Sequence, residues 1–346
     1  MKNCRVLMTP LKQIGDINME YSSAGLKKLT GTSRANPSLG FTREQFVHEL
    51  PLAQKGMSIS GYQPKLQMVL KDNEFSVVDH QGDYILKPSP SEFPYLAENE
   101  HATMTVMERL KFDVPPHGLL SFKKENPDDE LEFAFIIKRF DRCENTGNPI
   151  HQEQLDGAMG ISDKFGKTKS DGKQYVSYEQ VIKFLINSID DNVKFKIELF
   201  RRIAYAYLLG NNDMHLRNFG IIHPSTGKPH LSPVYDFVSV APYNAYFSSC
   251  YLALPLLVKE EGDKELAFGF KTEYGEYIGV DFLELGQNMG LSPKLTEKLI
   301  TDLKNESHIV ESTYKDSFMP AQDIEDTLRC YRSRLERILV FQAALI

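Results

Sequence analysis

The feature that most constrains the fold is the order of short motifs around residues 210–222, GNNDMHLRNFGII. An amphipathic segment ending in AYAYLLG precedes them, and FGIIH, the turn STGK and the run LSPVYDF follow. This order predicts a helix, a loop, a short strand, a turn and a second strand that ends at Asp236. We expect Asp213 and Asn218 to lie on the loop, and Asp236 to face them from the end of the hairpin.

Two carboxylates and one amide in this setting suit the transfer of a phosphoryl group. One carboxylate can accept the proton of the attacking hydroxyl group, while the amide and the second carboxylate hold magnesium on the phosphates. The interval from Asp213 to Asn218 is that of the protein-kinase catalytic loop. That loop has His and Arg where this chain has Asn211 and Asn212. The same interval also occurs in capped turns, so a structural role stays open.

Length and charge limit the class of protein. The 346 residues are enough for two domains or two lobes, each with its own core. The net charge of -7 provides no basic field, so we expect no direct binding of nucleic acid. Four scattered cysteines without a C-x-x-C pair argue against a zinc site or a disulfide framework. We see no signal-peptide h-region and no membrane-spanning run, and we expect a cytoplasmic protein, with export into another cell left open.

A segment rich in small residues, QKGMSISGYQPKLQMVL, occupies residues 54–70 and ends in a strand-like run. Glycine and serine let the backbone approach a phosphate closely, and successive N–H groups can form an anion-binding nest there. The segment matches neither G-x-G-x-x-G nor the Walker A pattern, so a simple hairpin turn is the alternative. The local sequence alone does not choose between the two.

A second pair of charged residues lies in the first third of the chain. Residues 84–86 read as a strand that presents Lys87 at its end, and Glu100 follows in a helix with a buried apolar face. A strand lysine paired with a helix glutamate is how kinases hold the α- and β-phosphates of ATP. The alternative is a solvated lysine and an ordinary surface acid.

The pattern of elements changes near residue 143. DVPPHGLLSF and LEFAFIIKRF read as two more strands, and residues 138–141 follow the second of them, where a kinase hinge would meet adenine. Beyond them we predict an amphipathic helix over HQEQLDGAMG, a polar loop over ISDKFGKTKSDGKQYVSY and packing helices to the C-terminus. The fold class is therefore α+β with two lobes, a mixed β/α N-terminal lobe over residues 1–140 and a mainly helical C-terminal lobe over 141–346.

The ordered set SISGYQPKLQMVL, YILKPSP, AENEHATM, IIKRFDR, HQEQLDGAMG, GNNDMHLRNFGI and SPVYDFVS resembles the HipA-type serine/threonine kinase toxins. The resemblance covers nearly the whole chain, and it is closest to the short, HipT-like members that lack an extra N-terminal subdomain. It implies a protein-kinase-like fold, ATP and Mg²⁺ as cofactors, Asp213 as the catalytic base, and Asn218 and Asp236 as the metal ligands. The ATP contacts that it implies are Ser60, Gly61, Tyr62, Gln63, Lys65, Lys87, Lys138, Arg139, Phe140, His215, Tyr235 and Asp236, supported by Glu100 and Gln152.

The resemblance also implies regulation and partners. In this family a serine of the phosphate loop becomes phosphorylated and the kinase shuts down, and Ser58 and Ser60 are the candidates here. The implied substrate is an aminoacyl-tRNA synthetase, and the implied partner is a DNA-binding antitoxin. Because the N-terminal subdomain of longer members is missing, a separately encoded subunit could replace it. A small-molecule kinase and a catalytically inactive antitoxin-binding module are the alternatives.

Overall fold

In the computed structural model of the chain, residues 2–11, 20–48, 64–143, 146–243 and 252–345 are described. The chain divides into two compact units. The first consists of Met1–Pro149 with Ser312–Pro320, and the second of Ile150–Glu311 with Ala321–Ile346. No helix within the described ranges is both long enough and apolar enough to cross a membrane.

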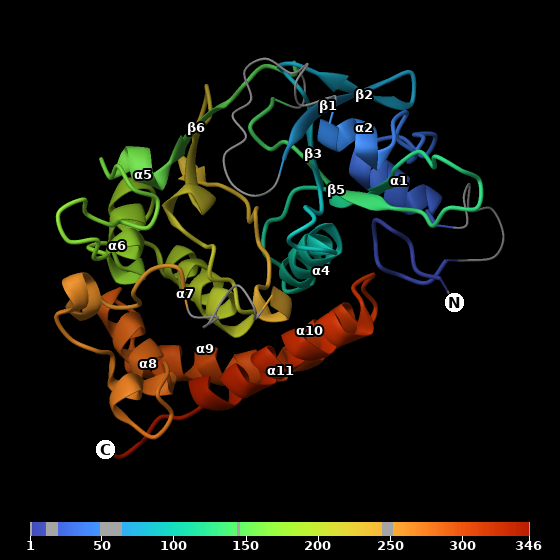
Figure 1. Cartoon of the computed structure of the whole chain (residues 1–346). Helices are drawn as coiled ribbons and strands as arrows, with labels where there is room; N and C mark the ends of the chain where they lie inside the picture. The colour runs from blue at the N-terminus through green and yellow to red at the C-terminus, as the bar shows by residue number, and fades with distance from the viewer. Residues whose placement is uncertain (1, 12–19, 49–63, 144–145, 244–251, 346) are drawn as a thin grey trace. The chain divides into compact units, whose positions relative to one another are not determined.

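A five-stranded antiparallel sheet with strand order β2-β1-β3-β5-β4 forms the centre of the first unit (Figure 1). Its strands are β1 (Leu66–Lys71), β2 (Glu74–Val78), β3 (Tyr84–Pro88), β4 (His117–Ser121) and β5 (Phe133–Lys138). Their alternating or continuous apolar runs are typical of strands that are buried on one or both faces. The strands predicted from the sequence in this region are confirmed.

Among the described residues of this unit, three helices accompany the sheet: α1 (Ser23–Thr30), α2 (Arg43–His48) and α4 (Leu96–Arg109). Local sequence explains where α2 begins. The backbone N–H of Gln45 donates to Thr42 Oγ1 at 3.2 Å, and the backbone N–H of Thr42 donates to Gln45 Oε1 at 2.9 Å. This reciprocal capping box satisfies two N–H groups that the first turn of a helix would otherwise leave unpaired.

The side chains of β3 alternate between the two faces of this sheet. Leu86 is fully buried in an apolar cluster that also contains Leu26 of α1 and Phe46 of α2. Lys87, the next residue, points to the opposite face and meets Glu100 of α4. The sheet therefore separates an apolar core from a face that carries a buried charge.

Residues 312–320 are distant in sequence from the rest of the first unit but belong to it. Phe318 stacks on His101 of α4, with ring centroids 6.1 Å apart and planes inclined by 8°. The hydroxyl groups of Tyr314 and Thr103 lie 3.0 Å apart and both side chains are buried. Residues 312–320, which form the end of one helix and the connection to the next, thus complete the core beside α4.

The second unit contains a three-stranded antiparallel sheet of β6 (His151–Gln154), β7 (Gly220–His223) and β8 (His230–Leu231). Its helices are α5 (Leu155–Ala158), α6 (Tyr178–Ser188), α7 (Val193–Leu208), α8 (Gly279–Asn288), α9 (Pro293–Asn305) and α11 (Ala321–Ile338), and α10 (Ser307–Lys315) starts in it. Short 3₁₀ helices cover Leu216–Asn218, Ala241–Tyr243, Val258–Asp263 and Phe268–Lys271. The prediction of a helical C-terminal region is confirmed.

The prediction of an amphipathic helix over HQEQLDGAMG is wrong for the first half of this segment. His151–Gln154 is the strand β6, paired along its length with β7, and only Leu155–Ala158 is helical. The pairing partner of β6 lies about 70 residues further along the chain, so a periodicity read within ten residues could not reveal it. Tertiary pairing here overrides the local helical pattern.

Candidate active site

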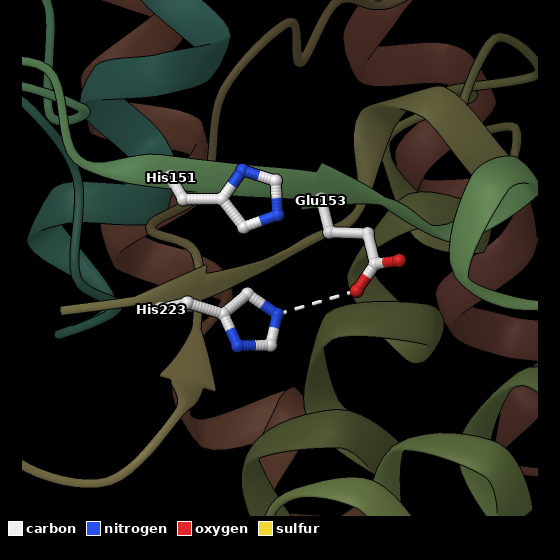
Figure 2. Close-up of side chains that lie close together, drawn as sticks. All are labelled: His151, Glu153 and His223. Carbon is white, nitrogen blue, oxygen red and sulfur yellow. Dashed lines mark hydrogen bonds and ion pairs between the residues drawn. The ribbon is translucent and has the colours of Figure 1, made fainter. Parts of the chain in front are cut away.

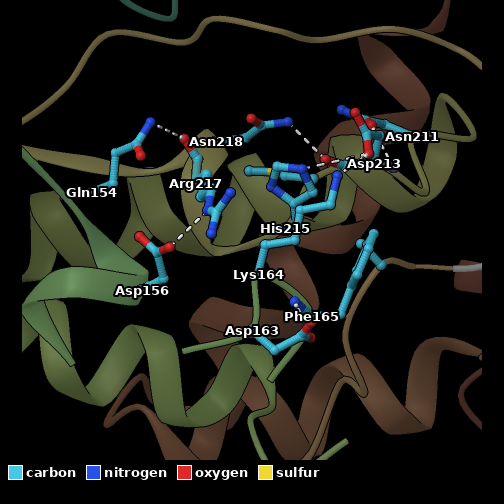
Figure 3. Close-up of polar contacts among 12 residues, drawn as sticks. Gln154, Asp156, Asp163, Lys164, Phe165, Asn211, Asp213, His215, Arg217 and Asn218 are labelled. Carbon is cyan, nitrogen blue, oxygen red and sulfur yellow. Dashed lines mark hydrogen bonds and ion pairs between the residues drawn. The ribbon is translucent and has the colours of Figure 1, made fainter. Parts of the chain in front are cut away.

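The loop that carries Asp213 is closed by its own side chains (Figure 3). Helix α7 ends at Leu208, and Gly210, with a φ of 69°, turns the chain into the loop. The backbone N–H of Asp213 donates to Asn211 Oδ1 at 3.1 Å, and Asn211 is fully buried. Asn218 Nδ2 donates to the backbone carbonyl of Asp213 at 2.7 Å. The Asp213 and Asn218 predicted from their spacing are therefore brought together by a direct hydrogen bond.

The carboxylate of Asp213 is half-exposed and lies near two nitrogen groups. Its Oδ1 is 3.6 Å from His215 Nε2 and 4.0 Å from Lys164 Nζ. Burial, and then the charge of Lys164, lower the pKa of His215 to about 4. His215 is therefore neutral at pH 7, and the positive charge next to the Asp213 carboxylate comes from Lys164.

Lys164 is a site residue that the sequence reasoning missed. It lies between α5 and α6, in the polar loop predicted over ISDKFGKTKSDGKQYVSY, and its backbone carbonyl accepts a 3.0 Å hydrogen bond from the N–H of Leu216. This bond holds the loop against the segment that follows Asp213. A lysine in a long polar loop was the only available signal, and it does not identify which acid the lysine approaches.

Tyr235 and Asp236 flank the same loop. The hydroxyl group of Tyr235 donates to the backbone carbonyl of Arg217 at 2.9 Å and accepts from Gln152 Nε2 at 3.2 Å. Asp236 has a φ of 52°, a left-handed conformation that is uncommon for a residue with a side chain and is often found at functional sites. The negative charge of Asp236 acts to raise the pKa of His215, against the larger effect of burial. Tyr235 thus contacts the loop directly, Gln152 contacts it through Tyr235, and the charge of Asp236 acts on His215. The roles assigned to these three residues stay predictions.

The donors at this loop fit a magnesium ion. Mg²⁺ prefers oxygen ligands, and Asp236 offers a carboxylate. Because the amide nitrogen of Asn218 is already bonded to a carbonyl, its amide oxygen is the atom that can face a cation. His215 Nδ1 is buried without a hydrogen-bond partner among the described residues, so it is a polar atom that a bound phosphate could satisfy. Asn218, Asp236 and His215 are therefore suited to a metal–phosphate ligand.

The first unit contains a second charged element, the ion pair of Lys87 and Glu100. Lys87 Nζ lies 2.5 Å from Glu100 Oε1, and the two side chains are 4% and 1% exposed. Lys87 Nζ also lies 5.5 Å from the centre of the Phe135 ring on the neighbouring strand. The pairing that the sequence suggested is present, and it is almost fully shielded from water.

The segment predicted as a hinge has two of its backbone donors already engaged. The N–H of Lys138 donates to the carbonyl of Pro116 at 2.8 Å, and the N–H of Arg139 donates to the carbonyl of Asp83 at 2.7 Å. The guanidinium of Arg139 forms a bidentate pair with Asp141, at 2.9 and 2.6 Å. These two N–H groups are therefore not free donors for an adenine base.

The predicted phosphate loop precedes β1 in the chain. The predicted contacts Ser60, Gly61, Tyr62 and Gln63, and the candidate phosphorylation site Ser58, lie outside the described residues. Lys65 is described, half-buried and directly before β1. The roles of all these residues stay predictions.

The comparisons with known proteins agree with the motif order. The family model described as a HipA-like C-terminal domain matches residues 57–309. A Haemophilus influenzae protein named "Putative kinase" is 53% identical over 336 residues, which cover 97% of each chain. The serine/threonine-protein kinase toxin HipA of Shewanella oneidensis is 25% identical over 213 residues, which are 57% of this chain and 46% of that protein.

Two solved structures show the fold. Shewanella oneidensis HipA, in a complex with HipB and operator DNA, superimposes with a TM-score of 0.61 at 20% identity, over 82% of this chain and 64% of its own. The Helicobacter pylori proinflammatory kinase CtkA superimposes with a TM-score of 0.51 at 16% identity, over 82% of this chain and 91% of its own. The predicted α+β, HipA-like kinase fold is confirmed. The chain belongs to the family of proteins with a HipA-like C-terminal domain.

Proposed function

We propose that this protein is an ATP- and magnesium-dependent serine/threonine protein kinase. Asp213 accepts the proton of the acceptor hydroxyl group, and Asn218 and Asp236 hold the metal ion. Lys87, oriented by Glu100, binds the nucleotide phosphates. Magnesium, when bound, supplies the positive charge that offsets the phosphate oxygens.

The observation that carries this proposal is the buried ion pair of Lys87 and Glu100. Removing two charges from water costs several kcal/mol per ion, and apolar side chains of similar volume are often equally stabilising or more so. A buried pair is therefore poor evidence for a purely structural role. A strand lysine held by a helix glutamate is the arrangement that kinases use to bind ATP phosphates. The pair supports an enzyme over a module that only binds an antitoxin.

The acceptor and the partners are inferred from relatives. Shewanella oneidensis HipA is named a serine/threonine-protein kinase toxin, and its solved complex contains HipB and operator DNA. We infer that this chain acts on a protein hydroxyl group as the toxin of a toxin–antitoxin pair, with a DNA-binding antitoxin as partner. An aminoacyl-tRNA synthetase as the substrate, and a separately encoded subunit as a further partner, rest on the family resemblance alone.

We infer that Ser58 and Ser60 regulate the kinase. Both belong to the S-I-S sequence at the start of the predicted phosphate loop, and Ser60 is also the first of the predicted ATP contacts. A phosphoserine adds about -1.5 to -2 charges, which would repel the phosphates of ATP. Phosphorylation of this loop is therefore expected to inhibit nucleotide binding.

The test is intact mass and peptide mapping of dephosphorylated protein after incubation with ATP and magnesium. Wild type is expected to gain one or two phosphates in the peptide that contains Ser58 and Ser60. Asp213→Asn should gain phosphate slower by a factor of about 10²–10⁴, the usual contribution of a positioned base. Asp128→Asn, which changes an exposed acid of the first unit, is the matched control and should behave as wild type.

The remaining outcomes separate the alternatives. Phosphate transfer to a small molecule and to no protein in an acceptor screen would favour a small-molecule kinase. If neither wild type nor the control turned over ATP with any acceptor, an inactive antitoxin-binding module would replace the proposal. Equal turnover by wild type and Asp213→Asn would remove Asp213 from the mechanism.

A further inference from the structure

Two histidines and a glutamate gather on one face of the β6–β7 strand pair (Figure 2). His151 of β6 is directly opposite His223 of β7, and Glu153 follows His151 by two residues. Because side chains alternate along a strand, all three project from the same face of the sheet. One potential ligand atom from each residue lies within 4.8 Å of the others. The cluster is outside the set of residues assigned above to phosphoryl transfer.

The chemistry of the three side chains is that of a transition-metal site. His223 Nε2 lies 3.2 Å from Glu153 Oε2, and the two imidazole rings have centroids 5.2 Å apart. Metal–ligand bonds of about 2.0–2.2 Å in a tetrahedral site separate neighbouring donors by roughly 3.3–3.5 Å. The His223–Glu153 distance already matches this separation, and a modest rotation of the His151 side chain would bring its donor into range.

We propose that His151, Glu153 and His223 bind one divalent transition-metal ion, with zinc as the representative of the class. Two imidazoles and one carboxylate are a common ligand set for zinc and related ions, whereas magnesium prefers sites made of oxygen ligands. Three protein ligands leave at least one coordination position for water. His151 is exposed and the other two are half-buried, so an ion can enter from solvent.

The ion would link two strands whose ligands are about 70 residues apart in the chain. It would also lie next to Gln152, the residue predicted to support the ATP contacts, which is between two of the ligands in sequence and projects from the other face of β6. The Gln152 side chain lies against Gly220 of β7, where an added Cβ would come within 2.8 Å of Gln152 Nε2. Metal binding is therefore expected to stabilise the strand pair that holds Gln152, and this metal site does not depend on whether the protein is a kinase.

The alternative is a surface cluster of hydrogen-bonded and stacked side chains that binds no ion. Zinc binding distinguishes the two. We would remove metals and any polyhistidine tag from the full chain, add excess magnesium, and titrate zinc against a chromogenic chelator. Wild type should bind one zinc ion per chain with saturation, and its melting temperature should rise with zinc concentration.

Substitution of the ligands should weaken this binding selectively. Loss of a group that only orients a ligand already costs about 10–100-fold in metal affinity, so His223→Gln and Glu153→Gln should each cost at least that much. His230→Gln is the matched control, because His230 lies on β8 opposite Ile222, whose side chain faces away from the cluster. With cobalt in place of zinc, absorption bands of a nitrogen- and oxygen-ligated ion should occur in wild type and disappear in the His151→Gln, His223→Gln double variant.

Two results would overturn the proposal. One is zinc binding by wild type that is no tighter than that of the double variant. The other is an equal loss of affinity in His230→Gln and His223→Gln. Melting temperatures measured without metal would identify any variant that fails to fold. If a histidine variant fails to fold, the nearly isosteric Glu153→Gln, at a half-buried position, still tests the site.

Discussion

The amide nitrogen of Asn218 donates a 2.7 Å hydrogen bond to the backbone carbonyl of Asp213. The same carbonyl also accepts from the backbone N–H of His215 at 2.8 Å. The bond therefore does two things: it closes the loop, and it turns the amide oxygen of Asn218 away from the carbonyl. The residue proposed as a metal ligand is thus positioned by the residue proposed as the base.

Replacing Asn218 with Ala should separate these two effects. We expect the free energy of unfolding to fall by about 0.5–1.5 kcal/mol, because the Asp213 carbonyl keeps one donor. Magnesium-dependent binding of ATP should weaken, whereas binding without magnesium should change little. Urea unfolding measures the change in stability, and nucleotide titrations with and without magnesium measure the change in ATP binding. Asn305→Ala, which changes an exposed residue of α9, is the control. An unchanged magnesium effect would mean that the ion is held elsewhere.

The buried pair of Lys87 and Glu100 gives a double-mutant test. Lys87→Met and Glu100→Leu should each destabilise the protein by about 3–5 kcal/mol, since each removes one partner of a buried ion pair. The double variant should recover much of that stability, because two apolar side chains replace the pair. Its phosphoryl transfer should stay near background. Urea unfolding and kinase assays on wild type, the two single variants and the double variant measure stability and phosphoryl transfer. An active double variant would limit the pair to a structural role.

Lys164 should affect catalysis more than stability. Its ammonium group is 4.0 Å from Asp213 Oδ1, and both side chains are more than a third exposed, so the ion pair is worth at most about 1 kcal/mol. Lys164→Met should nevertheless slow turnover severalfold, and Lys164→Arg should slow it less. Lys167→Met changes an exposed lysine of the same loop and serves as control. Initial rates that fall equally in Lys164→Met and Lys167→Met would point to a general effect of charge.

Two buried histidines in the first unit should make a contribution to stability that is lost in mild acid. Their rings lie 5.6 Å apart. Burial lowers the pKa of His101, and lowers that of His117 from 6.5 to about 4. At these two side chains the folded state therefore binds fewer protons than the unfolded state below pH 6.5, and their contribution to the unfolding free energy declines as the pH falls from about 6.5 to about 4. His117 alone can account for roughly 3 kcal/mol of this loss.

The measurement is urea unfolding of the protein between pH 4.5 and 7.5, a range that covers most of the pH interval in which the two histidines titrate. His117→Gln should be less stable than wild type at pH 7, because His117 lies 2.9 Å from the carbonyl of Pro115 and 3.2 Å from the hydroxyl group of Thr105. Its stability should depend less on pH. Parallel pH profiles for wild type and the variant would show that other groups are responsible.

The parts of the site that were predictable from sequence depend on contacts between near neighbours. Asp213 and Asn218 lie on one loop, and their spacing alone placed them in reach of each other. Lys87 and Glu100 are separated by 13 residues within a strand–helix unit, where the alternation of the strand and the apolar face of the helix indicate which way each side chain points. Patterns of this length carry enough information to position such pairs.

Other features were decided by long-range packing. The ordered motifs of the sequence indicated the family by resemblance. Periodicity and turn signals, which act over a few residues, indicated most of the elements and the local spacing of Asp213 and Asn218. Only the tertiary structure showed that His151 faces His223, that Lys164 approaches Asp213 and that residues 312–320 complete the core of the first unit. These contacts follow from strand register and from burial of apolar surface between segments tens to hundreds of residues apart, and no local pattern encodes either.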